Sequence, residues 1–364
     1  MRINILTTLG NGRCGIGTYT KYLSHEQKNL GHDINFYYIE PTKVYLIDFI
    51  KIANSIVRDC DIIHIQFDYS LFGKILGMTG IGVIVLYPII YLLSRMRKCK
   101  IVTTMHEVWD FRSPPKFEII GSIYTIIINY IIFKCSDTII VLSDNAYQTV
   151  KTQNIRVKKL FKIPHGVQTP RKYDKTISRM HFGLNQDSII ILQFGFISET
   201  KGQDILIEAS QRLPPRYTTI IAGSCKTPQD QKYFNLFKDK SPSNVIFYGF
   251  INEEDIPFLF NAVDIVVLPY RRITQSGVLN LSLSFMIPTI TSDLPYFKEI
   301  NNQFKCLLLF ESENPQALAD SITKIVQNEE VSHQMKENMQ RYVQMNTYQT
   351  IAREMDRIYL NCGV

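Results

Sequence analysis

Residues 192–209 read LQFGFISETKGQDILIEA, and this stretch decides how the chain folds. An apolar run ends at Phe194 and Gly195, a polar turn follows, and an amphipathic segment begins after Lys201 and Gly202. This pattern predicts a β-strand that turns directly into an α-helix. The Lys201 ammonium would then lie beside a helix N-terminus, where both supply positive potential to one anion, such as a diphosphate. A solvated surface lysine explains Lys201 equally well when the stretch is taken alone.

The same strand-then-helix order repeats on both sides of this stretch. Short apolar runs alternate with segments of helical spacing, which predicts an α/β fold of parallel sheets with helices on both faces. Such sheets bind ligands at the carboxyl ends of their strands. The expected strands are 2–8, 33–40, 61–67, 100–106, 137–143, 189–197, 218–223, 244–251, 264–270, 288–293 and 305–310.

The rhythm breaks at KIPHGV (162–167) and at the polar, basic stretch that follows it. We interpret this as a linker between two Rossmann-like domains that face each other across a central cleft. A chain of 364 residues is long enough for two such cores. The expected domains are 1–168 and 169–345, with a C-terminal helix in 346–364 that packs back towards the first domain.

Composition narrows the class of protein only in part. The chain is 45% hydrophobic and 20% charged, as folded proteins are, and its net charge of +7 fits nucleic acid, an anionic membrane or a phosphorylated substrate. Nucleic acid ranks last among these because the basic residues form no stripe interleaved with aromatic residues. The seven cysteines are scattered without ligand spacing, which argues against zinc and disulfides and favours a reducing compartment. The N-terminus reads as a first strand, not as a signal peptide.

Two segments, 75–94 and 119–133, are unusually apolar. The first has the length of a membrane span and precedes the basic run RMRKCK. Its glycines, Pro88 and the strand that follows favour a helix buried on a sheet or lying on a membrane surface over a true span. Peripheral membrane attachment is therefore a hypothesis for this protein.

Candidate binding residues follow two strands of the first domain. The glycine loop after the first strand contains Gly15, Ile16 and Gly17 at the start of a helix, where amide N–H groups can face a phosphate. Its spacing is not a clean G-x-G-x-x-G, so a dehydrogenase is disfavoured, and a structural turn explains the loop as well. His106 ends the strand at 100–106, a position from which α/β enzymes present side chains to a ligand, although a lone histidine is often structural.

The stretch YRRITQSGVLNLSLSFMIP (270–288) offers a second strand-to-helix turn. Arg271 and Arg272 precede a turn that leads into a helix near Gly277, which predicts an anion site. The alternative is an ordinary loop with solvated arginines. Because this turn and the turn at Lys201 belong to the same domain, we favour a functional interpretation of both.

Together these motifs resemble the GT-B glycosyltransferases of family 4, the retaining glycosyl transferases group 1, which take sugars from nucleotide-sugar donors. The resemblance covers nearly the whole chain and depends on the order and spacing of its pieces. They are CGIGTYTKYL (14–23), TTMHE (103–107), IPHGV (163–167), FGFISETKGQDILIEA (194–209), VIFYGFINEEDIPFLFNAVDIVVLPY (245–270) and NPQALADSI (314–322).

The resemblance implies roles for individual residues. His106 would contact the transferred sugar and Lys201 would stabilise the departing diphosphate. The donor phosphates would also be bound by Gly15, Ile16, Gly17, Arg271, Arg272, Ser276, Gly277 and Val278. The nucleoside and sugar would contact Phe250, Ile251, Leu268, Tyr270, Gln275 and Glu299. Neither a metal nor a cofactor is expected.

The chain departs from the family pattern in two places. The arginine that usually precedes the lysine is replaced by Phe196, and the two glutamates after the LPY strand are replaced by Ile273 and Leu281. We expect Arg271 or Arg272 to supply the charge that Phe196 lacks, and Gln275, Asn280 or Glu299 to substitute in part for the carboxylates.

The expected function is a retaining, metal-independent hexosyltransferase that uses a UDP- or GDP-sugar. Its acceptor would be a glycan linked to a polyprenyl diphosphate, in the biosynthesis of a surface polysaccharide such as a capsule or O-antigen. The enzyme would be cytoplasmic and peripheral at the inner face of the cell membrane. Two alternatives stay open: a non-catalytic binder of nucleotide sugars or glycans, and a sugar epimerase of the same architecture.

Overall fold

The computed structural model describes residues 1–8, 14–39, 46–75, 78–80, 82–112 and 118–363. The chain divides into two compact units, one made of Met1–Gly166 with Tyr348–Val364 and the other of Val167–Thr347. The sequence placed the divisions at 168/169 and 345/346, within two residues of these positions. The last helix belongs to the first unit.

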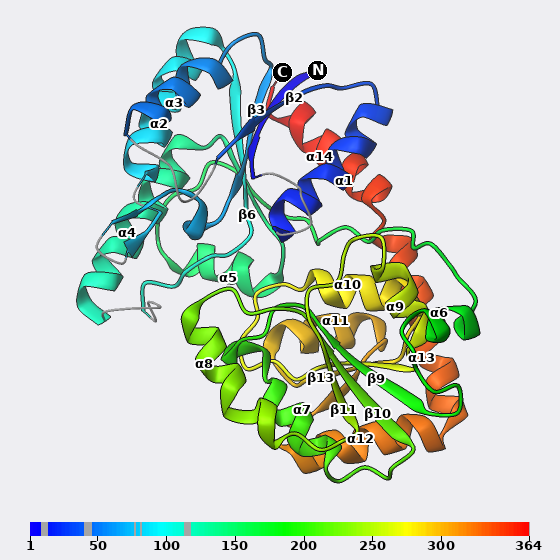
Figure 1. Cartoon of the computed structure of the whole chain (residues 1–364). Helices are drawn as coiled ribbons and strands as arrows, with labels where there is room; N and C mark the ends of the chain where they lie inside the picture. Colours follow the sequence, from blue (N-terminus) through cyan, green and yellow to red (C-terminus); the bar gives the residue numbers. More distant parts are fainter. Residues whose placement is uncertain (9–13, 40–45, 76–77, 81, 113–117, 364) are drawn as a thin grey trace. The chain divides into compact units, whose positions relative to one another are not determined.

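The first unit is built on a parallel sheet of six strands in the order β2-β1-β3-β6-β7-β8 (Figure 1). The strands are β1 (Arg2–Thr7), β2 (Asp33–Tyr38), β3 (Ile62–Phe67), β6 (Lys100–Met105), β7 (Thr138–Val141) and β8 (Leu160–Lys162). The helices are α1 (Gly15–Asn29), α2 (Leu46–Ile56), α3 (Val83–Arg97), α4 (Glu118–Cys135), α5 (Asp144–Thr152) and α14 (Tyr348–Asn361), and the pair β4 (Lys74–Ile75) and β5 (Met78–Thr79) with the turn η1 (Tyr69–Leu71) lies outside the main sheet.

Both faces of this sheet are buried, which is why its strands read as nearly continuous apolar runs. Ile3 and Ile5 of β1 pack in one hydrophobic cluster with Tyr19 of α1 and with α14. The next residue, Leu6, packs in the other cluster, with α2, α3 and α4. Figure 1 shows α14 beside α1, so the end of the chain completes the core built by its beginning.

The apolar segment 75–94 is not one helix. Its first residues contribute to the β4–β5 pair, and α3 begins only at Val83. The close packing of α2 and α3 requires Gly82, because a Cβ there would lie 2.1 Å from the Phe49 ring. Within the described part of the chain, no helix has both the length and the apolar character needed to cross a bilayer.

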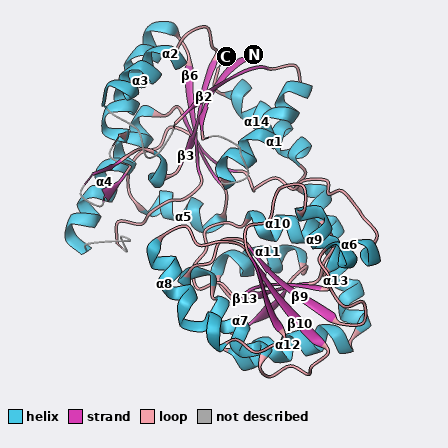
Figure 2. Ribbon diagram, in the orientation of Figure 1, coloured by secondary structure: helices cyan, strands magenta, loops and turns pink. Residues whose placement is uncertain are grey.

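The second unit repeats the plan with the strand order β11-β10-β9-β12-β13-β14, again all parallel (Figure 2). The strands are β9 (Ile189–Phe194), β10 (Tyr217–Ala222), β11 (Val245–Tyr248), β12 (Ile265–Leu268), β13 (Thr289–Ser292) and β14 (Leu308–Phe310). The helices are α6 (Lys175–His181), α7 (Gln203–Ser210), α8 (Pro228–Phe237), α9 (Ile256–Ala262), α10 (Gly277–Ser284), α11 (Pro295–Phe304), α12 (Pro315–Gln327) and α13 (Glu329–Met345), with 3-10 turns η2 (Glu199–Lys201) and η3 (Lys238–Lys240).

The strand order of each sheet reverses at one point. In the first unit the reversal lies between β1 and β3, and in the second it lies between β9 and β12. Loops that leave the carboxyl ends of such strands diverge to opposite faces and leave a place where ligands bind. All eleven strands expected from the sequence are present, and the two doubly wound sheets confirm the predicted α/β class.

Candidate functional site

The turn after β9 and the turn after β12 lie against each other. The Arg271 amide donates to the Thr200 carbonyl at 2.9 Å. Gly202, which ends η2, has φ +65°, and a Cβ there would lie 2.0 Å from the Pro269 carbonyl oxygen. Only glycine allows this approach, and it fixes the position of the adjacent Lys201.

Lys201 is a largely buried cation without a carboxylate partner among the described residues. Its Nζ lies 3.7 Å from the centre of the Tyr270 ring, and its own carbonyl accepts from the Gln193 amide at 2.7 Å. Burial, and secondarily repulsion from Lys226, lowers the Lys201 pKa from 10.5 to about 8. The group is therefore still mostly protonated at neutral pH, and its charge lies against the face of Tyr270.

Helix α10 begins at Gly277, seven residues after the Tyr270 whose ring lies against Lys201. Ser276 caps it, since its Oγ accepts from the Leu279 amide at 3.1 Å. The amides of Gly277 and Val278 have no acceptor among the described residues, as expected for the first turn of a helix. The side chain of Val278 would lie 3.5 Å from a Cβ on Gly195, so the end of β9 packs directly on this helix start.

The two arginines of the predicted anion loop have different surroundings. The Arg271 guanidinium donates to both carboxylate oxygens of Asp204 at 2.9 and 2.8 Å, to Glu313 at 2.7 Å and to the Glu199 carbonyl at 2.9 Å. Although burial opposes it, the hydrogen bonds from Arg271 hold the Asp204 pKa below its usual value. Arg271 therefore joins three segments of the protein and is poorly suited to bind a phosphate. Arg272 is exposed and has no carboxylate partner among the described residues.

The residues expected around the nucleoside and sugar are dispersed over the second unit. Leu268 is part of the core, and Tyr270 is buried under Lys201. Phe250 is half exposed and, with Ile251, follows β11, two strands from β9. Glu299 is on α11.

Two polar groups of this set remain near the start of α10. The buried Gln275 Oε1 has no hydrogen-bond partner among the described residues. The Ser276 amide donates to the Tyr296 hydroxyl at 3.4 Å, which brings α11 and therefore Glu299 towards α10. Asn280 is buried and accepts from the Tyr342 hydroxyl at 2.7 Å, a structural role.

In the first unit, His106 follows β6 and is almost completely buried. Its Nε2 lies 2.9 Å from Gln66 Oε1, an oxygen that can only accept, so Nε2 carries the proton and Nδ1 is an acceptor. Nδ1 has no partner among the described residues. Burial, with repulsion from His165 and His64, lowers the His106 pKa to about 3, so the imidazole is neutral at physiological pH.

A buried hydrogen-bond chain holds His106 from behind. The Gln66 amide donates to His64 Nε2 at 3.2 Å, and His64 Nδ1 lies 2.6 Å from the Tyr359 hydroxyl on α14. That hydroxyl also accepts from Gln27 of α1 at 2.9 Å. This series of hydrogen bonds was not expected from the sequence, because it joins residues almost 300 positions apart.

Tyr19 of α1 also faces His106. The two rings are 5.1 Å apart in an edge-on arrangement, and the buried Tyr19 hydroxyl has no partner among the described residues. The helix start at Gly15, Ile16 and Gly17 has no side-chain cap from Cys14, so the Cys14 side chain does not satisfy its first amides. The other glycines of this loop, Gly10 and Gly12, lie outside the described residues.

A model of the family described as Glycosyl transferases group 1 matches residues 174–342, almost the entire second unit. This match covers less than half of the chain, and through it the second unit is similar to the glycosyl transferases group 1 family. The chain is 25% identical over 258 residues to the O-antigen biosynthesis glycosyltransferase WclY of Escherichia coli, which covers 69% of each chain. It is 28% identical over 197 residues to the O-antigen chain mannosyltransferase C of Escherichia coli, covering 48% of this chain and 51% of the relative.

Comparison with solved structures shows that the chain has the GT-B fold. A glycosyltransferase from Rickettsia africae superposes with a TM-score of 0.76 at 18% identity, covering 99% of this chain and 98% of the other. Anabaena Alr3699/HepE in complex with UDP-glucose superposes with a TM-score of 0.75 at 16% identity, covering 99% and 100%. WaaG, a glycosyltransferase of lipopolysaccharide biosynthesis, gives a TM-score of 0.66 at 13% identity over 99% of each chain.

The places where this chain departs from the family pattern are apolar in the structure. Ile273 and Leu281 pack against the core of the second unit, so neither side chain leaves room for a ligand. Phe196 instead has a cation on its ring, because Nζ of Lys226 lies 3.6 Å from the ring centre. Lys226 was not expected from the sequence, although its position just after a strand neighbouring β9 was a signal.

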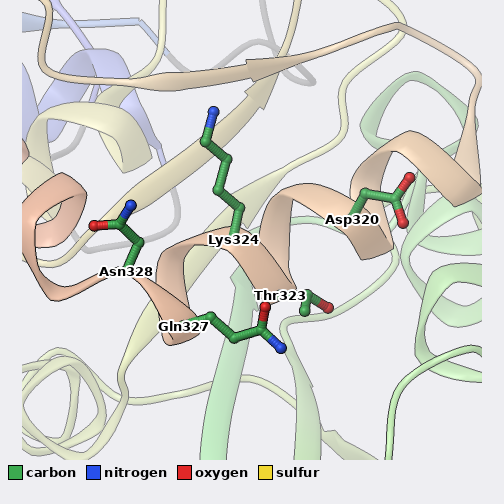
Figure 3. Close-up of a pocket in the computed structure, with 5 residues that line it drawn as sticks. All are labelled: Asp320, Thr323, Lys324, Gln327 and Asn328. Carbon is green, nitrogen blue, oxygen red and sulfur yellow. The ribbon is translucent and has the colours of Figure 1, made fainter.

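A surface hollow of the second unit is unrelated to these residues. It is lined by Asp320, Thr323, Lys324, Gln327 and Asn328. Figure 3 shows that all five side chains leave a single helix and its end, so the described lining comes from one element. Such a surface lacks the groups that hold a substrate.

Proposed function

We propose that this glycosyltransferase transfers a hexose, with retention of configuration, from a nucleoside-diphosphate sugar to a lipid-linked glycan in surface polysaccharide biosynthesis. The observation that carries the proposal is the partly buried Lys201 ammonium, which has no carboxylate partner in the described structure and lies on the ring of Tyr270, in the loop that leads to the open amides of Gly277 and Val278. HepE, a protein of the same fold, has been solved with UDP-glucose bound.

Bond cleavage at the donor places negative charge on the diphosphate that leaves. Lys201 and the α10 amides are already oriented for that charge and do not have to reorganise, which is the electrostatic form of catalysis. His106 is neutral, so it acts by hydrogen bonding to the sugar through its unpaired Nδ1 and not as a charged acid. Gly15, Ile16 and Gly17 would add amides near the donor phosphate and the acceptor.

The donor is tested by incubating the protein with UDP-, GDP- and ADP-sugars and a lipid-linked acceptor extract, and following the release of nucleoside diphosphate and the labelled product. We expect activity with one donor class, no loss of activity in EDTA, and retention of the anomeric configuration by NMR. Loss of activity on metal removal, or an inverted product, would contradict the proposal. Lys201→Ala is the inactive control.

The apolar outer face of the first unit supports a membrane-borne acceptor. Helices α2, α3 and α4 lie side by side in Figure 1. Basic residues, among them Arg97, Lys98 and Lys134, are exposed near the ends of α3 and α4. A surface of this kind fits an anionic lipid bilayer, with apolar side chains in the interface and lysine and arginine at the headgroups. The exposed apolar side chains are Ile47, Ile50, Ile84, Leu92, Met96, Ile123, Ile126, Ile127 and Tyr130.

We therefore place the enzyme at the cytoplasmic face of the membrane. The test is flotation with vesicles that contain or lack anionic lipid, using wild type and the double variant Leu92→Ser, Met96→Ser. Binding that needs anionic lipid and is weakened in the variant supports this placement. A protein that stays in the unbound fraction with both vesicles contradicts it, without affecting the assignment of the donor.

One observation favours a second function. Because Ile273 and Leu281 replace the carboxylates of the family pattern and pack into the core, the chain could bind a nucleotide sugar without transferring it. This binder would show a thermal shift with the nucleotide sugar but no release of nucleoside diphosphate above the Lys201→Ala control. Turnover with any acceptor excludes it.

A further inference from the structure

Lys226 is held beside Phe196 by the backbone of two neighbouring loops. It follows β10, which pairs with β9, and the pairing continues beyond the strands: Ile197 and Cys225 form a parallel bridge, and the Ile197 amide donates to the Ser224 carbonyl at 3.1 Å. Gly223 has φ +151°, and a Cβ there would lie 1.8 Å from the Gly195 carbonyl oxygen. The loop after β10 is therefore fixed against the loop that carries Lys201.

Lys226 is exposed, and among the described residues its ammonium contacts no carboxylate. Its Nζ instead lies 3.6 Å from the centre of the Phe196 ring. Lys201 has the same arrangement on Tyr270, and repulsion between the two lysines contributes to the lowered Lys201 pKa. Two like charges near each other, with no counter-ion in the described structure, are suited to an anion that carries more than one negative charge.

The neighbouring groups give the positive charge of Lys226 no other evident role. The start of α8 is closed by a capping box, in which Thr227 and Asp230 satisfy each other's backbone amides, so no second anion site opens there. Arg271, which the sequence suggested as a source of positive charge, is occupied by Asp204 and Glu313.

We propose that Lys226 is a second cation for the donor diphosphate, acting together with Lys201, and that Phe196 is the aromatic surface on which it is positioned. The proposal rests on the proposed function, since it adds a residue to the same donor site. Lys226, lying on the Phe196 ring, then supplies a second positive charge from the loop next to the one that carries Lys201. The ligand class is a nucleoside diphosphate or its sugar ester, bound through both phosphates.

The experiment measures the Kd of UDP and of GDP by calorimetry for wild type, Lys201→Ala, Lys226→Met and Lys226→Arg. Methionine keeps the apolar contact with Phe196 and removes the charge. Lys238→Met is the matched control, because Lys238 also lies over a phenylalanine ring, 5.6 Å from the centre of Phe234, at the far end of α8. Circular dichroism and melting confirm that each variant is folded.

We expect Lys226→Met to raise the Kd about 10- to 100-fold, the effect of one charge-assisted hydrogen bond. Lys238→Met should bind as wild type does. Lys226→Arg should keep most of the affinity because it keeps the charge, and Phe196→Arg should restore affinity to Lys226→Met. An unchanged Kd in Lys226→Met, while Lys201→Ala loses binding, would overturn this inference and leave the proposed function standing. If wild type binds neither UDP nor GDP, ADP is measured in the same way, and binding of none of the three contradicts both the inference and the proposed function.

Discussion

Replacing Lys201 with methionine should make the protein more stable while it removes donor binding. The Lys201 ammonium lies in a largely buried place with no carboxylate partner among the described residues, and protonation there is unfavourable. Methionine has a similar length, can stay against the Tyr270 ring and brings no charge. The site therefore stores free energy that binding of an anion would release.

The magnitude follows from the pKa. Its fall from 10.5 to about 8 corresponds to about 3 kcal/mol, at about 1.4 kcal/mol per pKa unit. The contact with the Tyr270 face offsets up to about 2 kcal/mol of this cost. We expect Lys201→Met to raise the free energy of unfolding by about 1–3 kcal/mol at pH 7, or the melting temperature by about 2–4 °C for each kcal/mol.

The pH dependence has a definite sign. Between about 8 and 10.5 the unfolded chain holds the lysine proton and the folded chain does not, so the wild-type unfolding free energy rises with pH across this window. The gain from Lys201→Met is complete below pH 8 and disappears towards pH 10.5. The assay is urea unfolding of wild type, Lys201→Met and the exposed control Lys238→Met at pH 7 and at pH 10. A variant that is less stable than wild type at pH 7 would refute the reasoning, because Lys201 would then have a stabilising partner.

Three further predictions concern the same elements. UDP affinity of wild type should fall as pH rises through about 8, because free Lys201 loses the proton that the diphosphate needs; a Kd that is flat from pH 7 to 9.5 would contradict this. Gly202→Ala should weaken UDP binding at least tenfold, since the new Cβ displaces the Lys201 turn, whereas Gly183→Ala, with a similar φ of +63° and nothing within 4 Å, should cost about 1–2 kcal/mol of stability and leave the Kd unchanged. Tyr359→Phe should lower kcat for transfer without changing donor affinity, because it frees the chain that positions His106; Tyr87→Phe, which removes another buried hydroxyl of this unit, should cost similar stability, about 1–3 kcal/mol, and leave kcat unchanged.

Local patterns predicted most of the fold because most strands are recognisable from their own apolar composition. The runs at 189–197 and 264–270 are apolar throughout since both faces of their sheet are covered. Strand β8 (Leu160–Lys162) was not predicted from the sequence. It has only three residues, two partly buried and one exposed, and at a sheet edge these carry no such apolar pattern. The division of segment 75–94 into a strand pair and a helix was not predicted for a different reason. The β4–β5 pair depends on backbone pairing, whereas the composition of the segment is apolar throughout.

The site was less predictable because its charges depend on neighbours across the sheet. Sequence spacing correctly predicted that Lys201 and the start of α10 follow strands, and β9 and β12 are adjacent in the sheet. It could not show that Arg271 would be held by Asp204 and Glu313, since those carboxylates are 67 and 42 positions away. The hydrogen-bond series that supports His106 could not be predicted for the same reason, because His64 and Tyr359 are separated by 295 positions.

The exchange of roles between Arg271 and Lys226 has one physical explanation. An arginine guanidinium fits two carboxylate oxygens at once, and Arg271 uses this geometry to tie the start of α7 to the loop after β12. A lysine is a single point of charge on a flexible stem, which can lie on an aromatic ring and still move to a phosphate. Arg271 therefore holds the loops together, whereas our proposal assigns Lys201 and Lys226 to the ligand. On this reasoning, Arg271→Lys should loosen the Lys201 turn and destabilise the fold, whereas Lys226→Arg should preserve binding.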